Sequence, residues 1–80
     1  MKRYLLFVFD AYYPSGGWSD FRGDFDFEEQ AREAMRTLQV QYLDKDYAQI
    51  VDIVTGSIEK WLQDEKVINK TRVREWVKEV

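Results

Sequence analysis

The sequence contains no cysteine, no histidine and only one proline among its 80 residues. Without cysteine it has no disulfide framework, no thiol nucleophile and no ligands for an iron–sulfur cluster or a cysteine-type zinc site. Without histidine it lacks the commonest zinc ligand and the commonest acid–base group at neutral pH. Ser-His-Asp and Cys-His catalysis are therefore excluded.

Long apolar runs are missing as well. Residues 4–9 form an apolar run behind two positive charges, as in a signal peptide, but Asp10 ends it and no small-residue cleavage site follows. No segment approaches the roughly 20 apolar residues that a membrane span requires. We expect a cytoplasmic protein that does not contact a membrane, and at 80 residues a single domain, 1–80, with one thin core.

The residues that are present include 45% hydrophobic and 16% aromatic side chains, with a formal charge of −3. The apolar run at 4–9 is short and aromatic, which predicts a buried strand. A Pro-Ser-Gly-Gly stretch at 14–17 predicts a loop, and the partial alternation over 18–25 predicts a second strand antiparallel to the first.

A helix is predicted to begin near Phe27. Asp26 is a favourable N-cap, and Glu29, three residues later, completes a capping-box pattern. The residues spaced to form one apolar helix face are Phe27, Ala31, Ala34, Met35 and Leu38.

β-Branched residues are frequent near the start of the second half of the chain. Residues 47–54 predict a third strand, and Thr55-Gly56 predicts a hairpin turn into a fourth strand at 57–62, although helical spacing from Ser57 is an alternative there. Thr71 is a candidate cap for a C-terminal helix. The resulting order ββαββα predicts an α+β domain, with helices packed on one face of a small antiparallel sheet. Within this predicted domain we expect residues 1–62 to form the ββαββ core and residues 63–80 to form a C-terminal helical extension.

Nine of the thirteen aromatic residues precede the first predicted helix. Three of them, Tyr12, Tyr13 and Trp18, flank the Pro-Gly-Gly loop and are candidates for an exposed aromatic platform, with Asp20 and Arg22 beside it. Tyrosine and tryptophan provide stiff contact area with a polar group, as binding hot spots require. The alternative is that Trp18 folds back as a lid over the thin core.

Carboxylates surround the same loop at Asp10, Asp20, Asp24 and Asp26. Their spacing matches no calcium-binding loop, and Asp26 is explained as a helix cap, so we predict no metal site and no cofactor. A carboxylate enzyme using Asp10 and Asp20 is the least favoured hypothesis, because a domain of this size has little volume for a cleft.

The C-terminal segment 66–78 carries five basic residues and one acidic residue. Apolar residues interrupt the basic ones and the whole chain is acidic, so nucleic acid is not an expected partner. The apolar stripe of the predicted C-terminal helix is a candidate dimer or partner contact if the helix does not dock fully. Its members are Val73, Trp76, Val77 and Val80.

One motif is specific: Tyr-Pro-x-Gly-Gly-Trp-x-Asp-Phe at 13–21, followed by Gly-Asp-Phe-Asp at 23–26, Ile-Val-Asp at 50–52 and Thr-Gly at 55–56. It resembles a group of short uncharacterised proteins of bacteria and their phages. The resemblance covers roughly residues 4–58. It implies a phage or bacterial setting, hence the host cytoplasm for a phage protein, and a compact ββαββ core.

Two functional hypotheses follow. The first is a non-enzymatic binding module that binds and inhibits a host protein, for example a defence-system component, through the aromatic loop surface. The alternative is a small-ligand binder that captures a nucleotide or another anion between Tyr12, Trp18 and Arg22, across a homodimer, and so sequesters a signal molecule.

Overall fold

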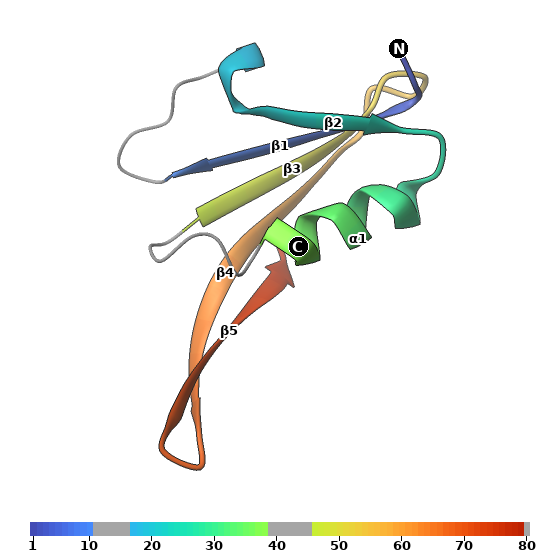
Figure 1. Cartoon of the computed structure of the whole chain (residues 1–80). Helices are drawn as coiled ribbons and strands as arrows, with labels where there is room; N and C mark the ends of the chain where they lie inside the picture. Colours follow the sequence, from blue (N-terminus) through green and yellow to red (C-terminus); the bar gives the residue numbers. More distant parts are fainter. Residues whose placement is uncertain (11–16, 39–45, 80) are drawn as a thin grey trace.

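The computed structural model of the chain describes residues 1–10, 17–38 and 46–79. These residues form one antiparallel sheet of five strands in the order β2-β1-β3-β4-β5 (Figure 1). A short 3-10 helix, η1 (Gly17–Asp20), precedes β2, and one α-helix, α1 (Glu28–Leu38), follows it. The strands are β1 (Tyr4–Asp10), β2 (Phe21–Phe25), β3 (Asp46–Asp52), β4 (Ile58–Ile68) and β5 (Thr71–Lys78).

The predicted α+β class with order ββαββα is wrong, because the described chain is predominantly antiparallel sheet with one α-helix. The predicted C-terminal helix is strand β5, and the proposed helical extension from residue 63 is the second half of the β4–β5 hairpin. The apolar residues of the segment 71–78 match helical spacing, but a helix this short has little stability of its own. Pairing of Thr71–Lys78 with β4 satisfies the backbone instead.

Helix α1 confirms the predicted helix, with its cap shifted by one residue. The Phe27 carbonyl accepts from the backbone N–H of Gln30 and Ala31, and the Gln30 Oε1 accepts from the Phe27 N–H at 3.2 Å. Gln30 therefore takes the capping-box role predicted for Glu29. Phe27 is 68% exposed, so it does not belong to the apolar helix face.

The turn between β3 and β4 confirms the Thr-Gly hairpin signal. Gly56 has φ +77°, a region that glycine enters without steric cost, and its N–H donates to the Asp52 carbonyl at 2.7 Å. The Asp52 carboxylate also accepts from the Val54 N–H at 3.0 Å. The predicted strand at 57–62 begins directly after this turn and continues to Ile68.

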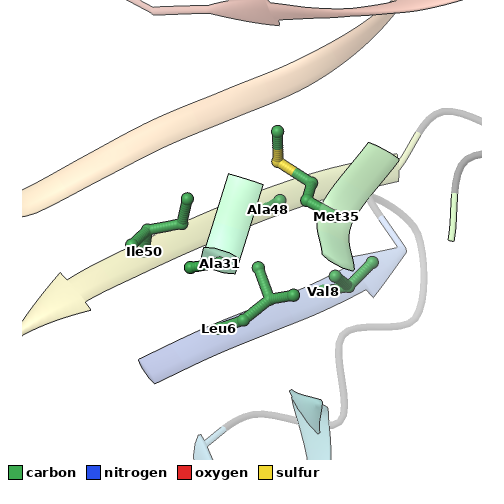
Figure 2. Packing of buried hydrophobic residues seen from close by; sticks show 6 residues of the cluster. All are labelled: Leu6, Val8, Ala31, Met35, Ala48 and Ile50. Atoms are coloured by element: carbon green, nitrogen blue, oxygen red, sulfur yellow. The ribbon is translucent and has the colours of Figure 1, made fainter. Parts of the chain in front are cut away.

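The hydrophobic core lies between α1 and one face of the sheet (Figure 2). Strand residues alternate between the two faces, so every second residue of the central strands points at the helix. We call this side of the sheet the covered face. The fully buried cluster consists of Leu6, Val8, Ala31, Met35, Ala48 and Ile50.

Candidate functional site

The opposite side of the sheet, which we call the open face, carries the side chains of the other alternate residues of each strand. No helix among residues 1–10, 17–38 and 46–79 packs across it in the way that α1 packs on the covered face. The strand register places one row of apolar side chains across four neighbouring strands of this face. In order from β1 to β5 the row is Phe9, Tyr47, Leu62 and Val77.

Two groups of aromatic rings lie on this face. Phe9 and Tyr47 stack, with ring centroids 5.8 Å apart and an angle of 17° between the rings. Trp18 approaches Phe7 at 5.9 Å and Phe21 at 5.3 Å, the latter edge-to-face. Such pairs are typical aromatic geometries that hold rings in place. Trp18 is nevertheless 63% exposed, so most of its surface faces solvent.

A β-bulge brings Phe21 into this group. The pairing of β1 with β2 shifts between Leu6 and Phe7, so that Phe7 is opposite Phe21 although Leu6 is opposite Gly23. The extra residue on β2 is Arg22, which is exposed and donates to the Phe21 carbonyl at 3.1 Å. Bulges of this kind redirect side chains at the edge of a sheet.

The predicted binding residues are therefore only partly brought together. Trp18 lies against Phe7 and Phe21 and does not close over the core, as the lid alternative required. Asp20 is 7% exposed, so it offers little surface to a partner, whereas Arg22 is exposed at the β2 edge. Tyr12 and Tyr13 lie outside the described residues.

The predicted C-terminal contact residues do not share one surface. Strand alternation places Val73 and Val77 on the open face and Trp76 on the covered face. The indole N–H of Trp76 donates to the Met35 carbonyl at 3.1 Å, which satisfies a backbone group in the last turn of α1. Val80 lies outside the described residues.

Five residues of the open face were not predicted from the sequence: Phe7, Phe9, Phe21, Tyr47 and Leu62. The sequence predicts the first two only as parts of a buried strand, because the run at 4–9 is apolar throughout. The available signal was residue size. The even positions Leu6 and Val8 are aliphatic, whereas the odd positions Phe7 and Phe9 are aromatic.

A network of charges holds α1 against β4 on the covered side. The Arg32 guanidinium donates to both carboxylate oxygens of Glu59, at 3.0 and 2.9 Å, and to Glu28 at 2.7 Å. The Trp61 indole N–H also donates to Glu59, at 2.7 Å. The Glu59 side chain is only 8% exposed, and both of its carboxylate oxygens accept hydrogen bonds. The buried carboxylate is therefore compensated by a charge-assisted bidentate pair.

The pKa values of the two carboxyl groups in this network are shifted in opposite directions. Burial alone would raise the pKa of Glu59, but hydrogen bonds, foremost from Arg32 and also from Trp61, lower the pKa to about 2. The pKa of Glu28 is raised, first by its interaction with the Glu59 carboxylate and then by burial. The fold therefore favours the charged form of Glu59, the carboxylate that Arg32 contacts through both oxygens.

A cleft of about 260 Å³ opens beside this network. Three carboxylates line it, those of Glu28, Asp52 and Glu59, against the single cation Lys78. Arg3 neutralises Asp52 through two hydrogen bonds of 2.9 Å and, opposed by burial, lowers its pKa. Because carboxylates outnumber cations in its lining, this cleft disfavours an anionic ligand. In the described part of the chain, no three acidic side chains are grouped to hold a metal ion.

The fold and the two faces define a small antiparallel-sheet protein, with one face sealed by a helix and the other bearing exposed aromatic rings. The chain belongs to the family described as Bacteriophage T4 protein Y07C, whose profile matches residues 4–60. The match ends inside β4, so most of the β4–β5 hairpin lies beyond it. Neither the curated proteins nor the solved structures contain a significant match. No described helix is long and apolar enough to cross a membrane.

Proposed function

We propose that this phage-family protein is a non-enzymatic binding module that occupies, and thereby inhibits, a protein of the host cell through its open face. The observation that carries the proposal is the exposed Trp18, held edge-on against Phe21 at 5.3 Å and beside Phe7. A pre-oriented tryptophan loses little conformational freedom on binding and buries a large area, which is the behaviour of a hot spot.

The row across the sheet supports the same proposal. Phe9, Tyr47, Leu62 and Val77 continue the apolar surface from the Trp18 group to the β5 edge, and Val77 is 39% exposed. An apolar patch that spans a rigid sheet favours contact with another protein. In a phage setting the concrete version is inhibition of a host defence component.

Site-specific crosslinking tests this proposal. A photoreactive phenylalanine analogue is placed at position 18 in one protein and at position 54 in another, since Val54 is also exposed, at 70%, but lies in the β3–β4 turn. In host lysate we expect a discrete crosslinked host protein from position 18 and none from position 54. The identified protein is then purified and titrated with the wild type, Trp18→Ala and Val54→Ala.

We expect Trp18→Ala to weaken that affinity by roughly 30-fold, as for a hot-spot tryptophan, and Val54→Ala to leave it unchanged. The activity of the purified partner, measured with increasing wild-type protein, should fall in proportion to occupancy. Equal crosslinking from both positions, or equal affinity of both alanine variants, would show that the open face is not the binding surface.

A further inference from the structure

Polar residues border the apolar row of the open face on both sides, along the direction of the strands. The first border, two positions from the row, consists of Gln49, Lys60 and Glu79. The second border, two positions from the row on β4 and β5, consists of Asp64 and Glu75. On β1 the position of the first border is taken by Phe7, so the apolar surface widens there toward Trp18. The charged side chains of both borders are exposed, so the row is an apolar stripe between two polar edges.

The dimensions of this stripe match those of an α-helix. Lys60 and Asp64 are four positions apart on β4, and at about 3.4 Å per residue this separates the two borders by roughly 13 Å. A helix with its side chains has a diameter of about 10–12 Å. The row crosses three neighbouring strand intervals of about 4.8 Å, close to the helical pitch of about 5.4 Å. A helix laid across the strands would therefore bring one side chain per turn near one residue of the row.

Two other kinds of occupant fit this stripe less well. An extended segment lying across the row would bring unpaired backbone N–H and C=O groups onto apolar side chains, because the strands beneath it are hydrogen-bonded to one another. A flat protein surface would bury the charged borders together with the row, and removing charges from water is costly. A helix satisfies its own backbone and leaves both borders in contact with water.

The borders also differ in charge. In the first border, Lys60 lies opposite Glu79 across β4 and β5, so its charges sum to zero. In the second border, Glu75 forms an ion pair with Lys66, which lies one row further out, at 3.2 Å. With Asp64 this side of the row has two carboxylates against one cation. A helix that is basic along the edge facing Asp64 therefore complements the stripe.

We propose that the part of the host protein that meets the open face is an amphipathic α-helix lying across β1, β3, β4 and β5. Its apolar stripe packs on the row, with anchors at the i, i+3 or i+4, and i+7 spacing, and its basic edge faces Asp64. Trp18 contacts one end of this helix and Val77 the other. The inference rests on the proposed function, because it names the element of the host protein that the open face binds.

Mapping of crosslinks tests this geometry. The photoreactive phenylalanine analogue is placed at position 18 in one protein and at position 77 in another, since both side chains are exposed and lie toward opposite ends of the row. After irradiation in host lysate, the modified residues of the host protein are located by mass spectrometry. Both positions should modify one continuous segment of the same protein, at sites roughly 10–15 residues apart, as the rise of a helix across the sheet requires.

A synthetic peptide that spans the mapped segment then tests its conformation. The peptide is labelled with fluorescein and titrated with the wild-type protein by anisotropy. Proline at one solvent-facing position in its middle should weaken binding at least about 30-fold, whereas alanine at the same position should leave binding nearly unchanged, because only proline breaks a helix.

A charge-matched pair of protein variants tests the basic edge. Asp64→Asn should weaken peptide binding about threefold, as for an exposed charge pair. Glu33→Gln removes the same charge from an exposed pair on α1 and should change the affinity less than about 1.5-fold. Circular dichroism melting checks that both variants are folded.

The outcomes separate this inference from the proposed function. Absence of a discrete crosslinked protein from position 18 would overturn both. A crosslinked host protein whose modified sites lie in separate segments, or a mapped peptide that tolerates the proline, would leave the open face as the binding surface and overturn the helix. Equal affinity of Asp64→Asn and Glu33→Gln would overturn the basic edge.

Discussion

The two faces of the sheet are built from alternate residues of the same strands, and along the second half of β1 their side chains differ in kind. Leu6 and Val8 on the covered face are aliphatic and at most 1% exposed. Phe7 and Phe9, their neighbours on β1, are aromatic, lie on the open face and remain half-buried. Leu5 of the open face is buried, so the contrast is sharpest toward the aromatic end of the strand.

This difference shows a division of tasks within one thin domain. Aliphatic side chains interdigitate with Ala31 and Met35 of α1 and supply the packing that an 80-residue chain needs. Large rings on the opposite face hold one another in place and still present surface to solvent. Substitutions on the covered face should therefore change stability, and those on the open face should change binding.

The largest expected effect comes from the same change made on both faces. Leu6→Ala removes a fully buried side chain and should lower the free energy of unfolding by about 3 kcal/mol. Leu62→Ala, on the half-buried row of the open face, should cost about 1 kcal/mol. Urea denaturation of both variants measures the difference, and equal losses would show that the open face is also covered in the native protein.

Glu59→Gln tests the charged part of the covered side. It removes the bidentate acceptor of Arg32 and should cost about 2 kcal/mol, less than a fully severed buried pair, since Arg32 keeps Glu28. Glu33→Gln, at an exposed pair with Arg36, should cost less than about 0.5 kcal/mol. Comparable losses from the two would contradict a structural role for the buried pair.

The same pair predicts acid sensitivity. Because folding lowers the pKa of Glu59 from 4.5 to about 2, its contribution to stability is complete above about pH 5 and is lost as the pH falls toward 2. Other carboxyls with lowered pKa, such as Asp24 and Asp52, act in the same direction. Denaturation at several pH values should therefore show a smaller decline for Glu59→Gln than for the wild type, and parallel declines would contradict this assignment.

Gln63 is a buried polar residue on the covered face, where most buried side chains are apolar. It is 6% exposed, and neither atom of its side-chain amide has a hydrogen-bond partner among the described residues. Gln63→Met should raise the free energy of unfolding by about 1 kcal/mol, because the unsatisfied amide is removed at similar volume. Gln49→Met, on the half-buried open face, should change it by less than about 0.5 kcal/mol. Thermal melting of both variants measures the contrast.

Trp18→Ala is expected to change stability less than the substitutions of Leu6 and Glu59 on the covered side. Its side chain is 63% exposed, so the loss should be less than about 1 kcal/mol, although it removes contacts with Phe7 and Phe21. Chemical denaturation measures this, and we expect the free energy of unfolding of the variant to lie within about 1 kcal/mol of the wild type. A loss as large as that of Leu6→Ala would place Trp18 in the core instead.

Prediction from the sequence succeeded where the signal is local. The helix at Glu28–Leu38 and the turn at Gly56 were both anticipated, because caps and positive-φ turns depend on residues a few positions apart. Trp18 was also identified as a candidate binding residue, and its exposure is what that hypothesis requires. The rest of the open face was missed, because a uniformly apolar run does not reveal which of its residues meet the helix.

The C-terminal segment shows the opposite case. Val73, Trp76 and Val77 fit a helix by spacing, but pairing with β4 makes them a strand and sends Trp76 to the face opposite Val77. The bond that fixes Trp76 reaches Met35, 41 residues away. No local pattern encodes a contact of that separation.

The sequence by itself determined which chemistry this chain does not have, since it contains no cysteine and no histidine, and where its helix and its glycine turn form. The tertiary structure decided that Thr71–Lys78 is a strand, that Phe7, Phe9 and Tyr47 lie on the open face, and that Trp61 and Trp76 pack against the core on the covered side. The physical reason is that residue chemistry and local backbone preference belong to neighbouring residues, whereas strand pairing is settled by contacts between distant ones.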